Sequence, residues 1–340
     1  MKRLFAAVLA LCLLLCGCTN RPGADQKQYT ATFLDLFDTV TTVIGPGETE
    51  AGFQQQAQLI HDRLEVYHRL FDIYQEYEGL HNLKTVNDQA GIAPVKVDSL
   101  IIELLLDCCQ YYELTDGNVN VAMGSVLKLW HDARSNGVRD PSAAALPDAE
   151  KLKEAAGHTD MDTVVIDVEA STVYLTDPES SLDVGAVAKG WATQKVAEKF
   201  PAGILISVGG NVCATGPKTP EGTPWVIGIQ NPTGEGNLHT VYLKTGCVVT
   251  SGDYQRTFTV EGKAYHHIIH PETQMPAEYW RSVSVVCEDS ALADALSTAL
   301  FLLPLEEGQA LAERCGVQVL WVDVHEEEFM TPGFREIIRT

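Results

Sequence analysis

Two short stretches near residue 260 bring together side chains that transfer protons and bind anions. They are Thr250-Ser251-Gly252-Asp253-Tyr254-Gln255-Arg256 and His266-His267-Ile268-Ile269-His270-Pro271. Together they offer hydroxyl, carboxylate, guanidinium and imidazole groups, which a plain antiparallel hairpin has little need for. An unperturbed imidazole has a pKa of about 6.5, so a histidine here can act as a base at neutral pH. The two stretches indicate chemistry on an oxygen-rich, phosphorylated substrate.

A carboxylate and a hydroxyl are expected to share one face of a helix further along the chain. Asp294 and Thr298 are four residues apart within an Ala- and Leu-rich run, so in a helix they lie on the same side. A buried carboxylate is costly unless it is paired or binds a metal, and hard oxygen ligands suit Mg²⁺. The residues alone leave two interpretations open, a magnesium ligand pair or a buried Asp hydrogen-bonded to Thr.

Glycines mark two further stretches that could approach a ligand closely. In Asp183-Val184-Gly185-Ala186-Val187-Ala188-Lys189-Gly190-Trp191, a helix that begins after Gly185 would offer free amides to a phosphate, and Lys189 adds a positive charge. An equally good interpretation is a structural turn into an amphipathic helix with a solvated lysine. Gly209-Gly210-Asn211 ends an apolar strand, and alone it is a common turn.

His267 and His270 are three residues apart, a spacing that could also indicate a zinc site. Ile268 and Ile269 predict a strand, and alternation along it would put His267 and His270 on opposite faces. A zinc site needs convergent ligands, so the pattern disfavours zinc here.

The elements that must position these groups are strands and helices in mixed order. Hydrophobic spacing predicts helices at 53–71, 98–114, 187–200, 290–302 and 305–315. Alternation predicts a strand or hairpin at 29–44 and strands at 163–168, 172–176, 204–208, 225–230, 240–243, 256–260, 283–287 and 318–323. Clustered strands with interspersed helices, and no regular βαβ alternation, predict an α+β fold without a domain linker.

The N-terminus has the pattern of an export signal. Lys2-Arg3 precedes the apolar run from Leu4 to Leu15, and Leu15-Cys16-Gly17-Cys18 resembles the lipobox of bacterial lipoproteins. We expect a signal peptide at 1–17, a lipid anchor on Cys18, a tether at 18–28 and one domain at 29–340. This places the protein outside the cytoplasm on the bacterial membrane. The alternative is an ordinary cleaved leader.

Charge and cysteine usage narrow the class of protein. The formal net charge is −22, which argues against a general affinity for nucleic acid or an anionic membrane surface. Any phosphate site must therefore be a local pocket. The cysteines beyond the leader show neither a CxxC pair nor the spacing of a metal finger.

The motifs, taken in order, resemble the ApbE family, the FAD:protein FMN transferases. The matching segments are 183–191, 209–211, Pro224-Trp225 through Gln230-Asn231-Pro232, 250–254, 267–271 and 293–298. The resemblance runs from about Thr32 to the C-terminus. It implies a T-fold-like α+β domain, with mainly antiparallel sheets and packed helices, that binds FAD in an elongated cleft.

The resemblance also implies roles for individual residues. Mg²⁺ would be held by Asp294, Thr298 and the carbonyl of Ala186. His267 would be the base for the acceptor hydroxyl, with Asp253 and Lys189 as further catalytic residues. FAD contacts would come from Phe37, Asn120, Asp183, Lys189, Gly209, Gly210, Asn211, Ser251, Gly252 and Ile268. The implied reaction breaks the FAD pyrophosphate, attaches FMN to a Thr or Ser of an extracytoplasmic redox protein, and releases AMP.

Four positions depart from the family pattern. Phe37-Asp38-Thr39 stand where Met-Gly-Thr is common, Val119-Asn120 replace Phe-Asp, His270 replaces Asp, and Gln274 replaces Gly. Two alternative functions remain, a FAD pyrophosphatase that uses water as the nucleophile and a flavin-binding lipoprotein without catalysis. The change at His270 motivates the second, whereas intact Asp294, Thr298 and His267 argue against it.

Overall fold

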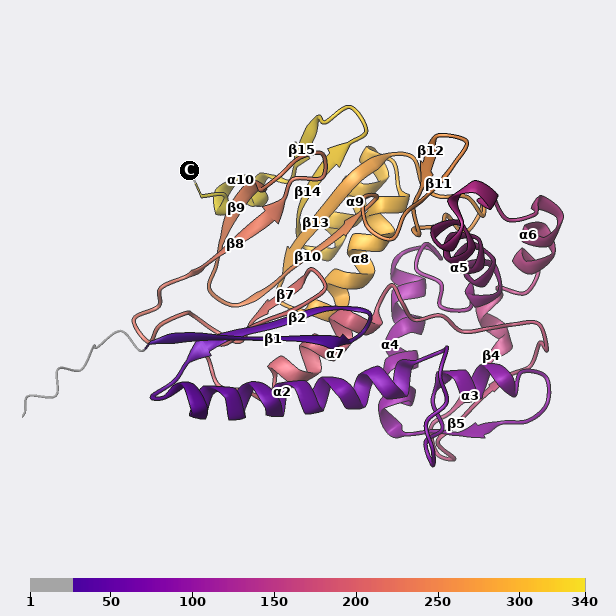
Figure 1. Ribbon diagram of the computed structural model, residues 1–340, viewed down its shortest axis with the longest axis horizontal. Coiled ribbons are helices and arrows are strands. Elements are labelled where there is room, and N and C mark those ends of the chain that lie inside the picture. The colour runs from indigo at the N-terminus through magenta and orange to yellow at the C-terminus, as the bar shows by residue number, and fades with distance from the viewer. Residues whose placement is uncertain (1–26, 340) are drawn as a thin grey trace, which may run out of the picture.

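The computed structural model describes residues 27–339, so the expected signal peptide, the lipidated Cys18 and nearly all of the tether lie outside the described residues. Its largest element is an eight-stranded antiparallel sheet in the order β1-β2-β6-β7-β10-β13-β14-β15 (Figure 1). These strands are β1 (Gln28–Leu36), β2 (Thr39–Pro46), β6 (Leu205–Val208), β7 (Asn211–Ala214), β10 (Gly246–Gly252), β13 (Trp280–Cys287), β14 (Gln318–Asp323) and β15 (Glu328–Met330).

Smaller sheets flank the main one. They are the three-stranded sheet of β3 (Val95–Lys96), β5 (Thr172–Leu175) and β4 (Val164–Asp167), and the hairpins β8 (Trp225–Gln230) with β9 (Asn237–Leu243) and β11 (Phe258–Val260) with β12 (Lys263–Tyr265). The helices are α2 (Glu50–Phe71), α3 (Leu83–Asp88), α4 (Ser99–Leu114), α5 (Gly124–Arg139), α6 (Ala149–Ala156), α7 (Ala188–Ala197), α8 (Ser290–Leu302), α9 (Leu305–Cys315) and α10 (Pro332–Ile337). The predicted α+β class with mainly antiparallel sheets is confirmed.

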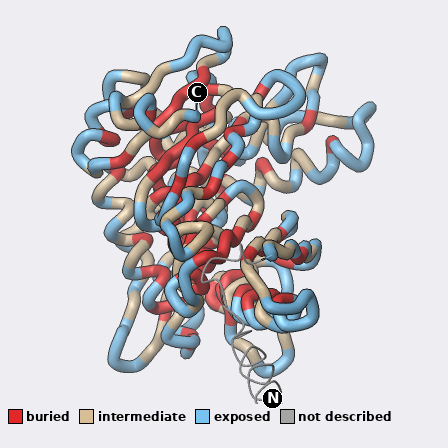
Figure 2. Tube along the Cα trace, turned by 90° about the vertical axis from the view of Figure 1, so that its left-hand side faces the viewer, coloured by how far each residue is buried: buried red, intermediate tan, exposed pale blue. Residues whose placement is uncertain are grey.

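Strand alternation divides the core between the two faces of the main sheet. Val249 of β10 packs into the cluster that contains α2, α7 and α8, while its neighbour Val248 packs against the β8–β9 hairpin and α10. Buried chain runs through the middle of the molecule, and exposed chain forms the loops around it (Figure 2). Both faces are therefore covered, and the functional groups gather at one end of the strands.

Two tight turns meet at that end. The β1–β2 turn is formed by Phe37 and Asp38, both with positive φ (53° and 52°), and the β6–β7 turn by Gly209 and Gly210 (56° and 94°). Two-residue hairpin loops with two positive φ angles match the right-handed twist of the strands. A Cβ at Gly209 would collide with Thr39, so only glycine allows the two turns to lie this close.

The structure corrects the strand that we predicted at His267 and His270. Residues 266–270 form no strand, and their one ladder contact is an isolated bridge between Ile269 and Pro276. The side chain of His266 explains the difference, because its Nδ1 accepts the amide of Ile268 and its Nε2 bonds to the carbonyl of Ala277. These local bonds replace a sheet ladder.

Among residues 27–339, we find no helix long and apolar enough to cross a bilayer.

Candidate functional site

The end of the main sheet opens into a cleft of about 800 Å³, within the size range of small-molecule and cofactor sites. It is walled by the β1–β2 turn, α5, the loop before α7, the end of β10, residues 266–269 and α8. The predicted site residues that line it are Phe37, Asn120, Asp183, Ala186, Lys189, Gly209, Asn211, Ser251, Gly252, His267, Ile268, Asp294 and Thr298. Two predicted residues, Gly210 and Asp253, are not part of this lining.

Asp294 is fixed by the helix that faces it. Its Oδ2 accepts the backbone amide of Gly190 at 2.8 Å and lies 3.7 Å from Nζ of Lys189, and the residue is only 4% exposed. A buried carboxylate that has an amide donor and a cation beside it is compensated. Thr298 lies one helical turn further along α8 and lines the same cleft. The predicted i, i+4 pair is therefore a real pair of oxygen donors facing the cleft.

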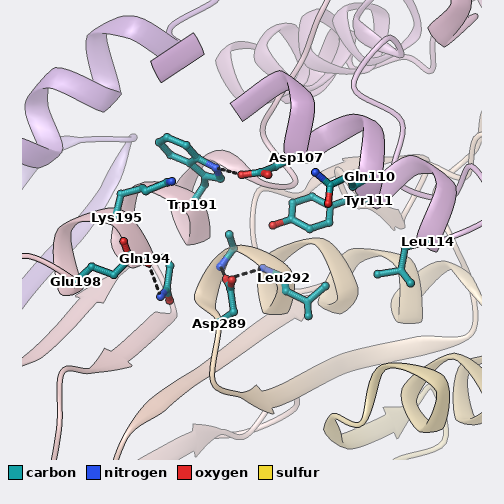
Figure 3. Close-up of a pocket in the computed structure, with 11 residues that line it drawn as sticks. Asp107, Gln110, Tyr111, Leu114, Trp191, Gln194, Lys195, Glu198, Asp289 and Leu292 are labelled. Atoms are coloured by element: carbon teal, nitrogen blue, oxygen red, sulfur yellow. Dashed lines mark hydrogen bonds between the residues drawn. The ribbon is translucent and has the colours of Figure 1, made fainter. Parts of the chain in front are cut away.

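A second hollow, of about 430 Å³, shows how α7 and α8 are held in place (Figure 3). The indole Nε1 of Trp191 donates to Asp107 of α4 at 2.8 Å, which ties α7 to α4. Gln194 of α7 accepts the amide of Ser290 at 2.9 Å, and Asp289 caps the first free amides of α8. These contacts set the position of α8, and with it Asp294.

His267 has the electrostatics of a base. His267 is exposed to the solvent of the cleft, yet protein atoms of the cleft walls surround its ring closely enough to disfavour its charged form. Desolvation, followed by the positive charges of Arg256, His266, Lys189 and Arg134, lowers the pKa of His267 below its usual value. The imidazole is therefore neutral at pH 7 and can accept a proton.

Three polar residues predicted to contact the ligand differ in whether their side chains already form hydrogen bonds within the protein. Asp183 accepts the amide of Gly185 at 2.8 Å, and burial raises the pKa of its carboxyl. Asn120 uses both ends of its amide on backbone, at Thr159 and Ala122, so it shapes the wall. Asn211 is 1% exposed, and its Nδ2 has no hydrogen-bond partner in the part of the chain that the structure describes. An orphaned donor in a cleft wall marks a position that can contact a ligand.

Sequence reasoning missed one wall of the cleft. Helix α5 contributes Trp130, His131 and Arg134, and the turn after α2 contributes Tyr74, whose ring stacks on His131 with centroids 4.9 Å apart. Arg134 and Arg256 both line the cleft, and between residues 27 and 339 neither forms a salt bridge. Burial and the charge of Arg256 lower the pKa of Arg134. Two guanidinium groups in one cleft without carboxylate partners provide local positive charge for an anion.

Four residues of the opening motifs do not line the cleft, namely Asp253, Tyr254, His270 and Pro271, and the side chains of two of them have polar contacts elsewhere. Asp253 pairs with Arg281, with 3.4 Å between Oδ2 and Nη1. His270 lies in the turn after the cleft segment, where its Nδ1 accepts the amide of Glu272 at 3.2 Å. The imidazole thus accepts the hydrogen bond that a carboxylate could accept at this turn.

Fold and cleft together define an α+β protein with one large ligand-binding site, lined by cations, imidazoles and oxygen donors. Residues 36–321 match the model of the ApbE family, and the chain belongs to this family. It is 36% identical over 260 residues to the FAD:protein FMN transferase of Treponema pallidum, covering 71% of this chain and 70% of that protein. Against the FAD:protein FMN transferase of Haemophilus influenzae it is 29% identical over 357 aligned residues, covering 100% and 99%.

Solved structures show the same fold. The ApbE protein of Thermotoga maritima has a TM-score of 0.81 at 28% identity, covering 92% of this chain and 100% of that one. The flavin transferase ApbE of Vibrio cholerae has a TM-score of 0.76 at 22% identity, covering 92% and 99%.

Proposed function

We propose that this protein transfers the FMN moiety of FAD to a threonine or serine of a target protein and releases AMP. Its family membership and relatives named FAD:protein FMN transferase support this. The observation that carries the proposal is that one cleft holds the imidazole of His267 together with the Asp294–Thr298 oxygen pair and Lys189. These groups match the needs of phosphoryl transfer, which depends on positioning and charge neutralisation.

The residues present fit a magnesium ion. The contacts of Asp294 with Gly190 and Lys189 both use Oδ2, which leaves Oδ1 available, and Thr298 lines the same cleft. With the carbonyl of Ala186 they offer hard oxygen donors, and Mg²⁺ typically completes its shell with water and phosphate oxygens. When bound, the ion would neutralise charge on the pyrophosphate.

His267 and the cations account for the remaining chemistry. His267 takes the proton of the acceptor hydroxyl, whose oxygen attacks the phosphorus on the FMN side of the pyrophosphate. The bond from that phosphorus to the bridging oxygen breaks, and AMP leaves with the bridging oxygen. Lys189, Arg134 and Arg256 supply positive charge along the same cleft.

Other parts of the cleft wall would recognise the rings of FAD. Phe37 and Tyr74 offer aromatic faces, and the free Nδ2 of Asn211 offers a donor to a carbonyl or nitrogen of a flat heterocycle. Gly209 and Ser251 line the same cleft.

We propose further that the protein works outside the cytoplasm, anchored through lipid on Cys18, on a redox protein in the same compartment. The basic start, apolar run and lipobox-like Cys18 support this placement. The test is fractionation of cells that express the wild type or Cys18→Ser. The wild type should sediment with membranes, and the variant should not.

The activity test uses the full chain with FAD, MgCl₂ and a target protein that carries the acceptor threonine. The mass of the target should rise by one FMN unit. His267→Gln and Asp294→Asn should abolish the rise, whereas the exposed His325→Gln should not. Free FMN and AMP without labelled protein would instead indicate a pyrophosphatase. Intact FAD in every reaction would indicate a flavin-binding protein without catalysis.

A further inference from the structure

Three cysteines form a row across neighbouring strands of the main sheet, at the opposite end from the cleft. Cys247 of β10 lies directly opposite Cys213 of β7 on one side and Cys287 of β13 on the other. Residues paired across a sheet point to the same face, so the three thiols lie side by side. The cleft residues Ser251 and Gly252 are at the far end of the same strand β10.

The two thiols of Cys247 and Cys287 are the close pair of this row. Their Sγ atoms are 3.9 Å apart and hydrogen-bonded. Directly opposed residues of antiparallel strands have Cα atoms about 4.5 to 5.5 Å apart, within the span that a disulfide bridges. Rotation about the Cα–Cβ bonds can bring the sulfur atoms to a bonding distance of about 2.0 Å.

We propose that Cys247 and Cys287 are an oxidisable pair that forms a disulfide between β10 and β13. The two residues are 40 positions apart, so the bond would close a long loop. Cys287 lies two residues before Asp289, the N-cap of α8. The bridge would therefore fasten the start of the helix that carries Asp294 and Thr298 to the strand that carries Ser251.

The environment assigns the two sulfur atoms different roles. Cys287 is partly exposed, whereas Cys247 is fully buried. The hydrogen bond from Cys247 lowers the pKa of the Cys287 thiol, which makes Cys287 the attacking thiolate. Burial raises the pKa of the Cys213 thiol to about 12, so that neighbour stays protonated.

The oxidant is a low-molecular-weight disulfide, such as the thiol pools of an oxidising compartment contain. The Cys287 thiolate attacks one sulfur of the reagent, forms a mixed disulfide and displaces one thiolate. Cys247 then attacks Sγ of Cys287 and displaces the second thiolate. The protein loses two electrons and two protons, and the reagent leaves as two thiols.

Among the described residues, no cysteine belongs to a group of three ligands close enough for one metal ion. The row therefore favours a covalent bridge over a metal–thiolate site. A bridge also differs from the family's flavin chemistry, because it involves neither the cleft nor FAD.

The test is oxidation of the native full chain with oxidised glutathione, followed by alkylation of free thiols and peptide mass mapping. We expect one crosslinked peptide pair joining Cys247 to Cys287, about 2 Da lighter than the two reduced peptides. The melting temperature should rise after oxidation. Cys109→Ser, which changes a cysteine of α4 outside the row, should give the same crosslink and the same rise.

The two single variants separate the roles of the sulfur atoms. Cys247→Ser should leave Cys287 as a mixed disulfide with glutathione, and Cys287→Ser should leave Cys247 as a free thiol, with no rise in melting temperature for either. The proposal is overturned if wild-type Cys247 and Cys287 are both recovered alkylated while a control dithiol peptide is oxidised. It is also overturned if the main crosslink joins Cys247 to Cys213.

Discussion

The backbone amide of Gly190 donates a 2.8 Å hydrogen bond to Oδ2 of Asp294, a residue 104 positions away in the sequence. The contact is possible because Gly190 has no side chain. A Cβ at this position would collide with the carbonyl oxygen of Ser290 and with Cβ of Asp294. The absence of a side chain at Gly190 thus allows α7 to approach α8 closely, and the same contact orients Asp294, the candidate metal ligand.

Gly190→Ala should therefore reduce both stability and activity. We expect a loss of about 2 kcal/mol in the free energy of unfolding, because the added methyl group forces the two helices apart. The control is Gly308→Ala in α9, also buried, where a Cβ would lie 3.5 Å or more from its neighbours. That change should leave stability equal or raise it by about 0.5 kcal/mol, because Ala is the better helix former. Urea unfolding curves of equal midpoint for the two variants would contradict this account.

The parts of the site that follow local patterns could be predicted from sequence. Asp294 and Thr298 came from an i, i+4 spacing, and the β1–β2 hairpin from alternation. Helix α5 was not predicted, although Val126, Leu127 and Trp130 have helical spacing, because Gly124 and Gly137 interrupt the pattern and Met123 is not a typical N-cap residue. Its position comes from packing of Trp130 and Val126 with Phe258 and Ile269, which are distant in sequence. Arg134 was missed with it.

The sequence motif predicts that Asp253 acts in catalysis, whereas in the structure Asp253 does not line the cleft. Its carboxylate faces Arg281, and among residues 27–339 neither Oδ1 of Asp253 nor Nε of Arg281, both buried, has a hydrogen-bond partner. We propose a positioning role, so Asp253→Asn should keep kcat within a few-fold of wild type and lower the free energy of unfolding by about 1 kcal/mol. If kcat instead falls as far as in His267→Gln while stability is unchanged, Asp253 acts directly in catalysis.

His270 tests whether an imidazole has simply replaced a carboxylate in a turn. Its Nδ1 accepts the amide of Glu272, and its backbone carbonyl accepts the amide of Gln274 at 2.9 Å. His270→Asp should keep stability and activity, because a carboxylate oxygen can accept the same amide. His270→Leu should lose about 1 kcal/mol of unfolding free energy with little change in KM for FAD. A rise in KM for FAD in either variant at unchanged stability would mean that His270 contacts the ligand.

The pH dependence of the reaction tests His267 as the base. Only the neutral imidazole can take the hydroxyl proton, and the pKa of His267 is held below its usual 6.5 by desolvation and by nearby positive charges, Arg256 first among them. As pH falls from 8, kcat/KM should stay level through pH 6.5 and decline only below it, as the imidazole gains its proton.

Arg256→Gln removes the charge that lowers the pKa of His267 most, so this pKa should rise and the acidic limb of the kcat/KM profile should move to higher pH. Arg335→Gln, an exposed change on α10, should leave the limb where it is. Mass-based initial rates at a series of pH values measure both variants beside the wild type. A limb that stays at the wild-type pH in Arg256→Gln, or that moves equally in Arg335→Gln, would show that another group controls the profile.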